Sequence, residues 1–143
     1  MDESTCVFCE IVAGTKNGRV VYETDSVIAL IDPRQANPGH ILVIPKDHFQ
    51  DIYALSEEAG AEIMKAMILL SQTVKKAFDL DGLSIWQSNG PGAHQEVPHV
   101  HFHIHPRKID DGLLRVYPRW LERVPNEELD SYADRVRQAL RDD

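Results

Sequence analysis

Residues 98–107, PHVHFHIHPR, place a histidine at every second position, with an apolar residue between each pair. The four histidines are His99, His101, His103 and His105. Because side chains alternate between the two faces of a β-strand, the segment predicts a strand with one apolar face and one face of imidazoles. Four imidazoles on one face are costly to bury, so the pattern indicates a metal site, a phosphate-handling catalytic site, or both.

The metal interpretation depends on the spacing of the histidines. Two histidines at positions i and i+2 of a strand can ligate one zinc ion, and a bound water would then perform hydrolysis with Glu96 as a general base. A jelly-roll metal site of this kind should come with many short strands and no long central helix. Residues 57–78 have the apolar spacing of a long helix, which counts against this alternative.

Phosphoryl or nucleotidyl transfer explains the histidine pattern better. A neutral imidazole attacks phosphorus and forms a phosphoramidate that water later hydrolyses, so one histidine divides the reaction into two steps. Residues two apart on a strand lie roughly 6.5–7 Å from each other, within reach of one phosphate. The preceding loop contains Gly90 and Gly92 and offers backbone N–H groups to the same anion. All seven histidines lie between His40 and His105, which predicts one site assembled from several segments.

The elements that must position this site alternate between strand and helix patterns. A long amphipathic helix is predicted from Glu57 to Phe78, with Ser56 as its N-cap. A short helix or turn is predicted over residues 6–14. Strands are predicted along the histidine segment and over residues 19–23, 27–31, 41–45 and 83–87. Hairpins on both sides of the long helix indicate an α+β fold, a mostly antiparallel sheet with one long helix packed on it.

The chain has 143 residues, a common length for a single domain. We expect one domain over residues 1–108 and a C-terminal extension over residues 109–143 that packs on the same domain. The extension carries one more amphipathic helix, marked by Leu129, Tyr132, Val136 and Leu140.

Charge and composition restrict the partners and the location. The net charge of −8 argues against affinity for a nucleic acid polymer or an anionic membrane, because the mean field repels both. The N-terminal residues MDESTC lack the apolar segment of a secretory signal, and no apolar run approaches membrane-spanning length. The two cysteines, Cys6 and Cys9, are too few for a secreted disulfide framework. We therefore expect a cytoplasmic protein.

Four blocks of the sequence together resemble the histidine triad (HIT) superfamily. The signature itself, His-apolar-His-apolar-His, is matched by HVHFHI at residues 99–104. The other blocks, in the family's order and spacing, are CVFCEIVAG, IALIDPRQANPGHILVIPKDH and GLSIWQSNGPGAHQEVP. The N-terminal C-x-x-C is similar to the Hint-like and bacterial branch of the family. The resemblance covers residues 6 to about 108.

The resemblance implies a HIT-like α+β fold and a nucleotide hydrolase or transferase that cleaves at the α-phosphate of purine nucleotides. Its substrates would be nucleoside phosphoramidates, adenylates or dinucleoside polyphosphates, and no organic cofactor is implied. By position in the motif, His101 would be the nucleophile that carries the nucleotidyl group, His103 would contact the phosphate or leaving group, and His40 would be the fourth family histidine.

The resemblance also implies a set of substrate-binding residues. Asp32 would hold the ribose hydroxyls, since a carboxylate accepts two donors at once. Ile31 would lie beside the base pocket. The loop on the phosphate side would contain Asn89, Gln95, Glu96 and Val97.

Three residues depart from the family pattern. His94 stands where a glycine is usual, so we expect a tightened or reshaped loop. Glu96 stands where many members have serine or threonine, and because an ionised carboxylate repels a phosphate we expect it to face away or to be protonated. His105 occupies a position that is normally apolar, and we expect it to be peripheral.

Two further expectations follow from the branch that the sequence resembles. A structural zinc ion would be bound by Cys6, Cys9, His48 and His99, with two reduced cysteines as the alternative. A two-fold homodimer would form through the long helix and a sheet edge, consistent with the wide apolar face around Met64 and Ile68. An interaction module that binds purine nucleotides with little turnover remains the main alternative to an enzyme.

Overall fold

The computed structural model describes residues 5–113, 117, 119 and 121–142. The chain divides into two compact units, Met1–Asp111 and Gly112–Asp143. The first unit contains all seven histidines and both cysteines. The packing of the C-terminal extension on the first unit stays a prediction.

The first unit is built on one five-stranded sheet in which every neighbouring pair of strands is antiparallel. In spatial order the strands are β1 (Val20–Glu23), β2 (Val27–Ile31), β3 (Ile41–Pro45), β5 (Phe102–Arg107) and β4 (Gly82–Trp86). The central strands are apolar because side chains cover both of their faces: β2 and β3 are buried at nine of their ten positions. The expected α+β fold with a mostly antiparallel sheet is confirmed.

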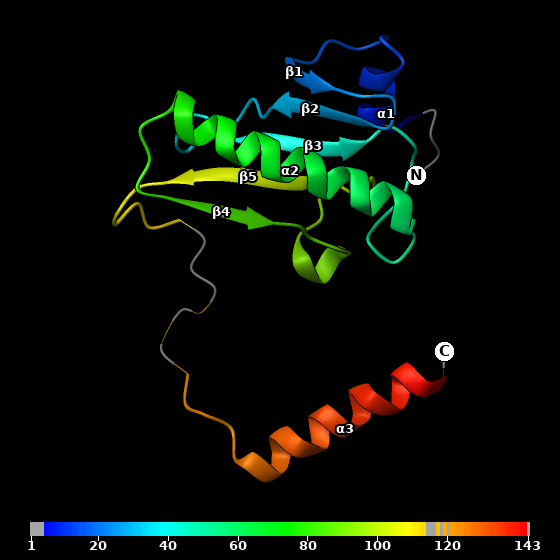
Figure 1. The fold of residues 1–143 in the computed structure, drawn as a ribbon, viewed down its shortest axis with the longest axis vertical. Helices are drawn as coiled ribbons and strands as arrows, with labels where there is room; N and C mark the ends of the chain where they lie inside the picture. Colours follow the sequence, from blue (N-terminus) through cyan, green and yellow to red (C-terminus); the bar gives the residue numbers. More distant parts are fainter. Residues whose placement is uncertain (1–4, 114–116, 118, 120, 143) are drawn as a thin grey trace. The chain divides into compact units, whose positions relative to one another are not determined.

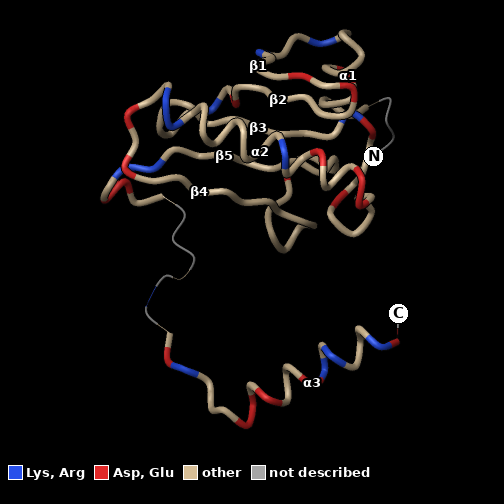
Figure 2. The backbone as a smooth tube through the Cα atoms, in the orientation of Figure 1, with Lys and Arg blue, Asp and Glu red and all other residues tan. Residues whose placement is uncertain are grey.

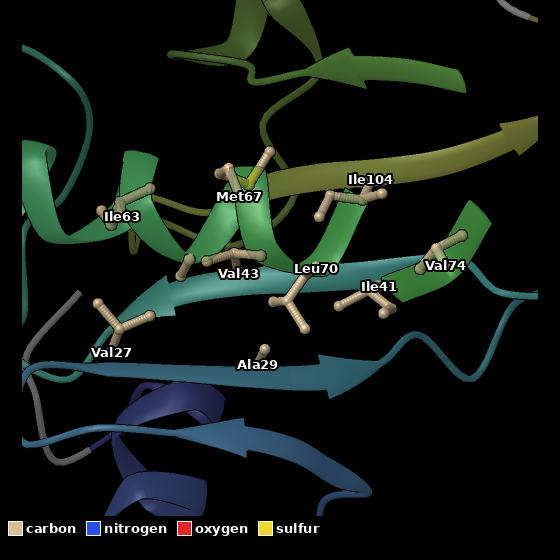
Figure 3. Packing of buried hydrophobic residues seen from close by; sticks show 10 residues of the cluster. Val27, Ala29, Ile41, Val43, Ile63, Met67, Leu70, Val74 and Ile104 are labelled. Carbon is tan, nitrogen blue, oxygen red and sulfur yellow. The ribbon is translucent and has the colours of Figure 1, made fainter. Parts of the chain in front are cut away.

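The long helix α2 (Glu57–Ala77) lies across one face of the sheet (Figure 1). It begins where the Ser56 hydroxyl accepts a hydrogen bond from the Ala59 N–H at 3.2 Å, as the capping pattern predicts. Its buried stripe meets alternate residues of three strands in one apolar cluster, as Figure 3 shows. The labelled members are Val27, Ala29, Ile41, Val43, Ile63, Met67, Leu70, Val74 and Ile104.

The opposite face of the sheet carries the short helix α1 (Val7–Val12). Because strand residues alternate, the side chains between those that face α2 form a second cluster with Cys6 and Phe8. Its sheet members are Ile28, Leu30, Leu42 and Ile44. In the β3–β5 ladder His103 is paired with Leu42, so His103 projects from this second face.

The histidine segment departs from the expected strand at its beginning. Strand β5 starts at Phe102, so His99 and His101 lie outside the ladder. The backbone N–H groups of this part are used elsewhere: that of His99 bonds the carbonyl of Val97, and that of Val100 bonds the carbonyl of Phe49 at 2.7 Å. The alternating pattern therefore predicts a strand correctly only from Phe102 onward.

The second unit contains the helix α3 (Asn126–Asp142). Acidic residues lie in its first turn and Arg141 in its last, the arrangement that complements the helix dipole; Figure 2 shows the change from acidic to basic along the helix. Across the described residues, no helix has both the length and the apolar character needed to cross a membrane.

Candidate active site and candidate metal centre

A cavity of about 270 Å³ opens on the sheet face opposite α2. The ends of adjacent antiparallel strands meet there, because Ile31 of β2 pairs with Ile41 of β3, and Trp86 of β4 pairs with His103 of β5. This brings together side chains from five segments that are distant in sequence. They are Phe8, Asp32, Arg34, His40, Leu42, Trp86, Ser88, His94, Gln95, Glu96, Val97, His101 and His103.

His101 is buried and is held in one tautomer by its neighbour. Its Nδ1 lies 2.7 Å from the backbone carbonyl oxygen of His99. Because a carbonyl only accepts hydrogen bonds, Nδ1 carries the hydrogen and Nε2 keeps its lone pair. Burial lowers the pKa of His101 below the usual value for histidine, which keeps the ring neutral. The ring borders the cavity, so it has the properties of a nucleophile.

His40 and His103 form a second imidazole unit beside His101. His40 Nε2 lies 2.9 Å from His103 Nδ1, and His40 Nδ1 lies 3.3 Å from the carbonyl oxygen of Arg34. The carbonyl fixes the hydrogen on His40 Nδ1, so His40 Nε2 accepts from the N–H of His103. Burial lowers the pKa of His40 and lowers that of His103 to about 3, and both rings are therefore neutral at pH 7.

Asp32 directly follows β2 and is buried at the edge of the same cavity. Its Oδ1 accepts a hydrogen bond from the Arg34 N–H at 2.7 Å, and its Oδ2 lies 3.8 Å from His40 Nδ1. The carboxylate thus lies beside the imidazole pair and keeps acceptor capacity for a ligand.

The loop before the histidine segment forms the outer wall of the cavity. The Gln95 side chain connects parts of this wall: its Oε1 accepts from the Gly90 N–H at 2.8 Å, and its Nε2 donates to the carbonyl oxygens of Gln50 and Val97. His94 has a φ of 57°, in the left-handed region where glycine is the usual residue. The backbone at His94 therefore has the conformation that is usual for glycine.

Glu96 differs from both expected states. It borders the cavity, and its Oε2 accepts a hydrogen bond from Arg34 NH2 at 2.7 Å. The hydrogen bond and the charge of Arg34 lower the pKa of the Glu96 carboxyl, so the group is ionised and paired instead of protonated or turned away. Arg34, which is 62 residues from Glu96 in the sequence, pairs with the carboxylate, and local sequence patterns do not reveal this pairing.

Two residues that the sequence placed beside the substrate, Asn89 and Ile31, are not among the described residues that line this cavity. The Asn89 side chain is bonded to the Ile52 N–H and to the Gln87 amide, and Ser88 borders the cavity in its place. Ile31 packs against the apolar cluster under α2. Alternation along a strand places Ile31 and Asp32 on opposite faces, and this signal was available in the sequence.

His105, expected to be peripheral, is buried beside His40 and Trp86 and is not among the described residues that line the cavity. Only 4% of the residue is exposed, and its ring centroid lies 4.6 Å from that of His40 and 5.3 Å from that of Trp86. Its Nδ1 donates to the carbonyl oxygen of Pro106 at 2.9 Å. His105 thus packs behind the imidazole unit. No signal in the sequence pointed to Trp86, because its place beside His103 depends on the register between β4 and β5.

The second cluster of potential ligands lies next to α1 and contains the four expected residues. The ligand atoms of Cys6, Cys9, His48 and His99 all lie within 4.8 Å of one another. Measured from His Nδ1 to Cys Sγ, three pairs are 3.3–3.5 Å apart. A tetrahedral zinc ion with its usual bond lengths would separate sulfur and nitrogen ligands by about 3.6 Å, so the spacing fits the metal.

The orientation of His99 also fits a metal ligand. Its Nε2 lies 2.8 Å from the carbonyl oxygen of Pro45, which fixes the hydrogen on Nε2 and directs the lone pair of Nδ1 toward the two sulfurs. Burial lowers the pKa of His99 to about 4, so the ring is neutral, as ligation requires. Cys6 and His99 are fully buried, which is typical of a structural site.

A family model described as the HIT domain matches residues 13–110. An adenosine 5′-monophosphoramidase of Schizosaccharomyces pombe is 38% identical over 112 residues, which cover 78% of this chain and 81% of that protein. The crystal structure of a HIT family protein from Bacillus anthracis superposes with a TM-score of 0.83 at 31% identity, covering 94% of this chain and 96% of the other. A zinc-bound histidine triad family protein from Mycobacterium smegmatis gives a TM-score of 0.72 at 30% identity, covering 99% and 98%.

The fold, the cavity and these similarities agree with the motif in residues 99–104. The chain belongs to the histidine triad (HIT) family.

Proposed function

We propose that this protein is a nucleotide hydrolase or transferase that cleaves purine nucleotides at the α-phosphate through a nucleotidyl group carried on His101. The observation that carries the proposal is the hydrogen bond from His101 Nδ1 to the His99 carbonyl, which leaves the Nε2 lone pair as the nucleophile. The similarity to an adenosine 5′-monophosphoramidase supports a nucleoside phosphoramidate as one substrate, with adenylates and dinucleoside polyphosphates as related candidates.

The reaction would proceed in two displacements at phosphorus. In the first, His101 Nε2 forms a bond to the α-phosphorus and the bond to the leaving group breaks. In the second, water attacks the same phosphorus, the P–N bond breaks, and the nucleoside monophosphate leaves. The sum is nucleotide plus water giving monophosphate plus the protonated leaving group.

His103 is the residue we assign to proton transfer. The negative charge of a bound phosphate raises the pKa of a nearby imidazole, so His103 holds a proton in the complex although its pKa is about 3 in the free protein. It gives this proton to the leaving group in the first step and takes one from water in the second. His40 accepts the Nδ1–H of His103 and so stabilises the charged ring.

Substrate binding is assigned to the remaining walls of the cavity. We assign the ribose hydroxyls to the Asp32 carboxylate, which keeps a free acceptor position. Gln95 and Val97 shape the phosphate side of the cavity. Zinc, bound by the two cysteines with His48 and His99, would supply a structural cross-link between α1 and the segments that flank the site.

The experiment that tests the proposal is release of AMP from adenosine 5′-phosphoramidate. His101→Ala should abolish release above background, and trapping the wild-type reaction should yield protein heavier by one nucleotidyl group on His101. His103→Ala and His40→Ala should slow the reaction by roughly 100-fold without removing the route. Near-normal turnover by His101→Ala would overturn the proposal and leave a binding module or a metal-bound water as the alternatives.

The alternative of a metal-bound water has one structural feature in its favour, since the ligand atoms of Asp32, His40 and His103 also lie within 4.8 Å of one another. The lone pair of His40 Nε2 is, however, used by the N–H of His103. This bond favours imidazole chemistry.

We also propose a homodimer, formed through α2 and the β4 edge of the sheet. The outer side of α2 carries exposed apolar residues, among them Met64 at 54% and Ile68 at 56% exposed. Ile85 of β4, paired with Ile104 and therefore on the face covered by α2, is 54% exposed. We place the protein in the cytoplasm, where reducing conditions keep cysteine thiols available as ligands.

A further inference from the structure

An ion pair joins two loops at the candidate active site and has no part in the reaction proposed above. Arg34 lies between β2 and β3, and Glu96 lies in the loop before β5. NH2 of Arg34 is 2.7 Å from Oε2 of Glu96, and NH1 is 3.4 Å from Oε1. Both residues border the cavity that contains His101 and His103.

The main chain of Arg34 is fixed to the site, although its side chain is 75% exposed. Its N–H donates to Asp32 Oδ1 at 2.7 Å, and its carbonyl oxygen accepts from His40 Nδ1 at 3.3 Å. The backbone that carries the guanidinium is therefore hydrogen-bonded to two residues of the proposed site, Asp32 and His40. Its charge acts on both neighbouring imidazoles, lowering the pKa of His40 and of His103.

The two partners differ in their remaining hydrogen-bonding capacity. Glu96 already has both carboxylate oxygens directed at Arg34. A guanidinium has five N–H donors, of which Glu96 engages at most one on each terminal nitrogen, and Nε lies 3.9 Å from Asp32 Oδ1. The second N–H of each terminal nitrogen therefore remains for a ligand. The unused capacity of the pair is thus a set of charged donors, which match the oxygens of a phosphate or sulfate.

We propose that Arg34, held in place by Glu96, determines leaving-group specificity by binding leaving groups that carry negative charge. The preferred substrates are nucleotides whose α-phosphate is joined to a further phosphate or a sulfate. This inference rests on the proposed function, since it assigns the leaving-group side of the same cavity. In free protein Glu96 keeps the guanidinium over the cavity, and a bound anion takes up the donors that Glu96 does not use.

A simpler role must be distinguished from recognition. Arg34 could merely neutralise Glu96, whose ionised carboxylate would otherwise repel every phosphate in the cavity. Removing Arg34 alone would then also disfavour the more highly charged substrate. The double variant Arg34→Gln/Glu96→Gln separates the roles, because it removes the repulsion and the recognition together while keeping an uncharged polar side chain at both positions.

The experiment compares kcat/KM for AMP release from adenosine 5′-phosphosulfate, whose leaving group is an anion, and from adenosine 5′-phosphoramidate, whose leaving group is ammonia. Arg34→Gln should lower the ratio of the two values by about tenfold, the lower end of the contribution of a hydrogen bond to a charged group. The double variant should keep the lowered ratio. A ratio that returns to the wild-type value in the double variant, or that is unchanged in Arg34→Gln, overturns the inference.

The matched control is Arg137→Gln, which removes an exposed arginine paired with Asp134 at 2.8 Å on α3. It should leave the ratio unchanged. Titration with AMP and ADP gives a readout that does not need turnover: Arg34→Gln and the double variant should both weaken ADP binding more than AMP binding, and an equal effect on the two ligands in either variant overturns the inference. Wild-type protein that releases AMP from neither substrate contradicts the proposed function, and the AMP and ADP affinities then decide the inference by themselves.

Discussion

The indole of Trp86 lies flat against the imidazole of His103, with ring centroids 4.4 Å apart and an angle of 6° between the planes. The contact arises from the sheet register, since Trp86 of β4 and His103 of β5 are directly paired in the ladder. The same indole lies 5.5 Å from the ring of His40. Trp86 therefore restricts the orientation in which His103 Nδ1 reaches His40 Nε2, and we regard it as a positioning residue.

The first prediction concerns this stacking contact. Trp86→Ala should lower kcat by up to about tenfold with little change in KM, because an aromatic pair contributes about 0.5–1.5 kcal/mol and here orients a proton-transfer group. Trp86→Phe should recover most of the loss, since phenylalanine can also stack. Steady-state kinetics at several pH values measure both effects. Equal loss in the two variants would argue against an orienting role.

The second prediction concerns the metal centre. Protein purified without chelator should contain about one zinc ion per chain, and removing it should destabilise the fold. Zinc present at 100–1,000 times its dissociation constant contributes about 3–4 kcal/mol, which corresponds to a fall of roughly 6–16 °C in Tm on removal. Metal analysis and thermal unfolding with and without chelator check this, and Cys9→Ser should abolish the chelator effect. A metal content well below one per chain would contradict the assignment.

Removal of zinc should also lower activity, through His99. The His99 ring contributes Nδ1 to the ligand cluster, and the His99 carbonyl accepts the hydrogen bond that fixes the tautomer of His101. Loss of the metal would loosen the segment from which both interactions originate.

The third prediction concerns pH and the stability that depends on His103. Its pKa is about 3 in the folded protein and near 6.5 in an unfolded chain, because burial disfavours the charged ring. Below pH 6.5 the unfolded state therefore binds a proton that the folded state does not, and the free energy of unfolding falls as the pH drops from about 6.5 toward 3.

A comparison with His103→Gln isolates this contribution, because glutamine does not titrate in the range. Urea unfolding at pH 7 and at pH 5 should show a smaller loss of stability for His103→Gln than for the wild type. The same loss in both proteins would show that His103 is not held neutral.

The fourth prediction concerns assembly. A dimer formed through α2 and the β4 edge has a mass of about 32 kDa, twice the 16.2 kDa of one chain. Ile68→Glu places a charge on the exposed apolar side of α2 and should shift the protein to monomer at micromolar concentration, while Ile68→Leu, which keeps this side apolar, should not. Light scattering distinguishes the two masses, and a monomer in the wild type would refute the proposal.

Local periodicity determined much of what the sequence revealed. The three- and four-residue spacing from Glu57 onward predicted α2, because packing on a sheet requires one continuous apolar stripe. The apolar runs predicted the strands, and the histidine alternation predicted a nucleophile among phosphate-binding neighbours, which the resemblance to the family assigned to His101. The four cysteine and histidine ligands also followed from the motif blocks of the sequence, and the structure brings them together.

Contacts between distant segments were decided only by the tertiary structure. Whether Ser88 or Asn89 borders the cavity depends on where β4 ends and how its loop bonds to Ile52, because one residue along a strand exchanges the two faces. The ionised state of Glu96 depends on Arg34, and the burial of His105 depends on the rings of His40 and Trp86. Sequence spacing fixes which side chains share a face of one element, but the register between strands fixes which of them meet.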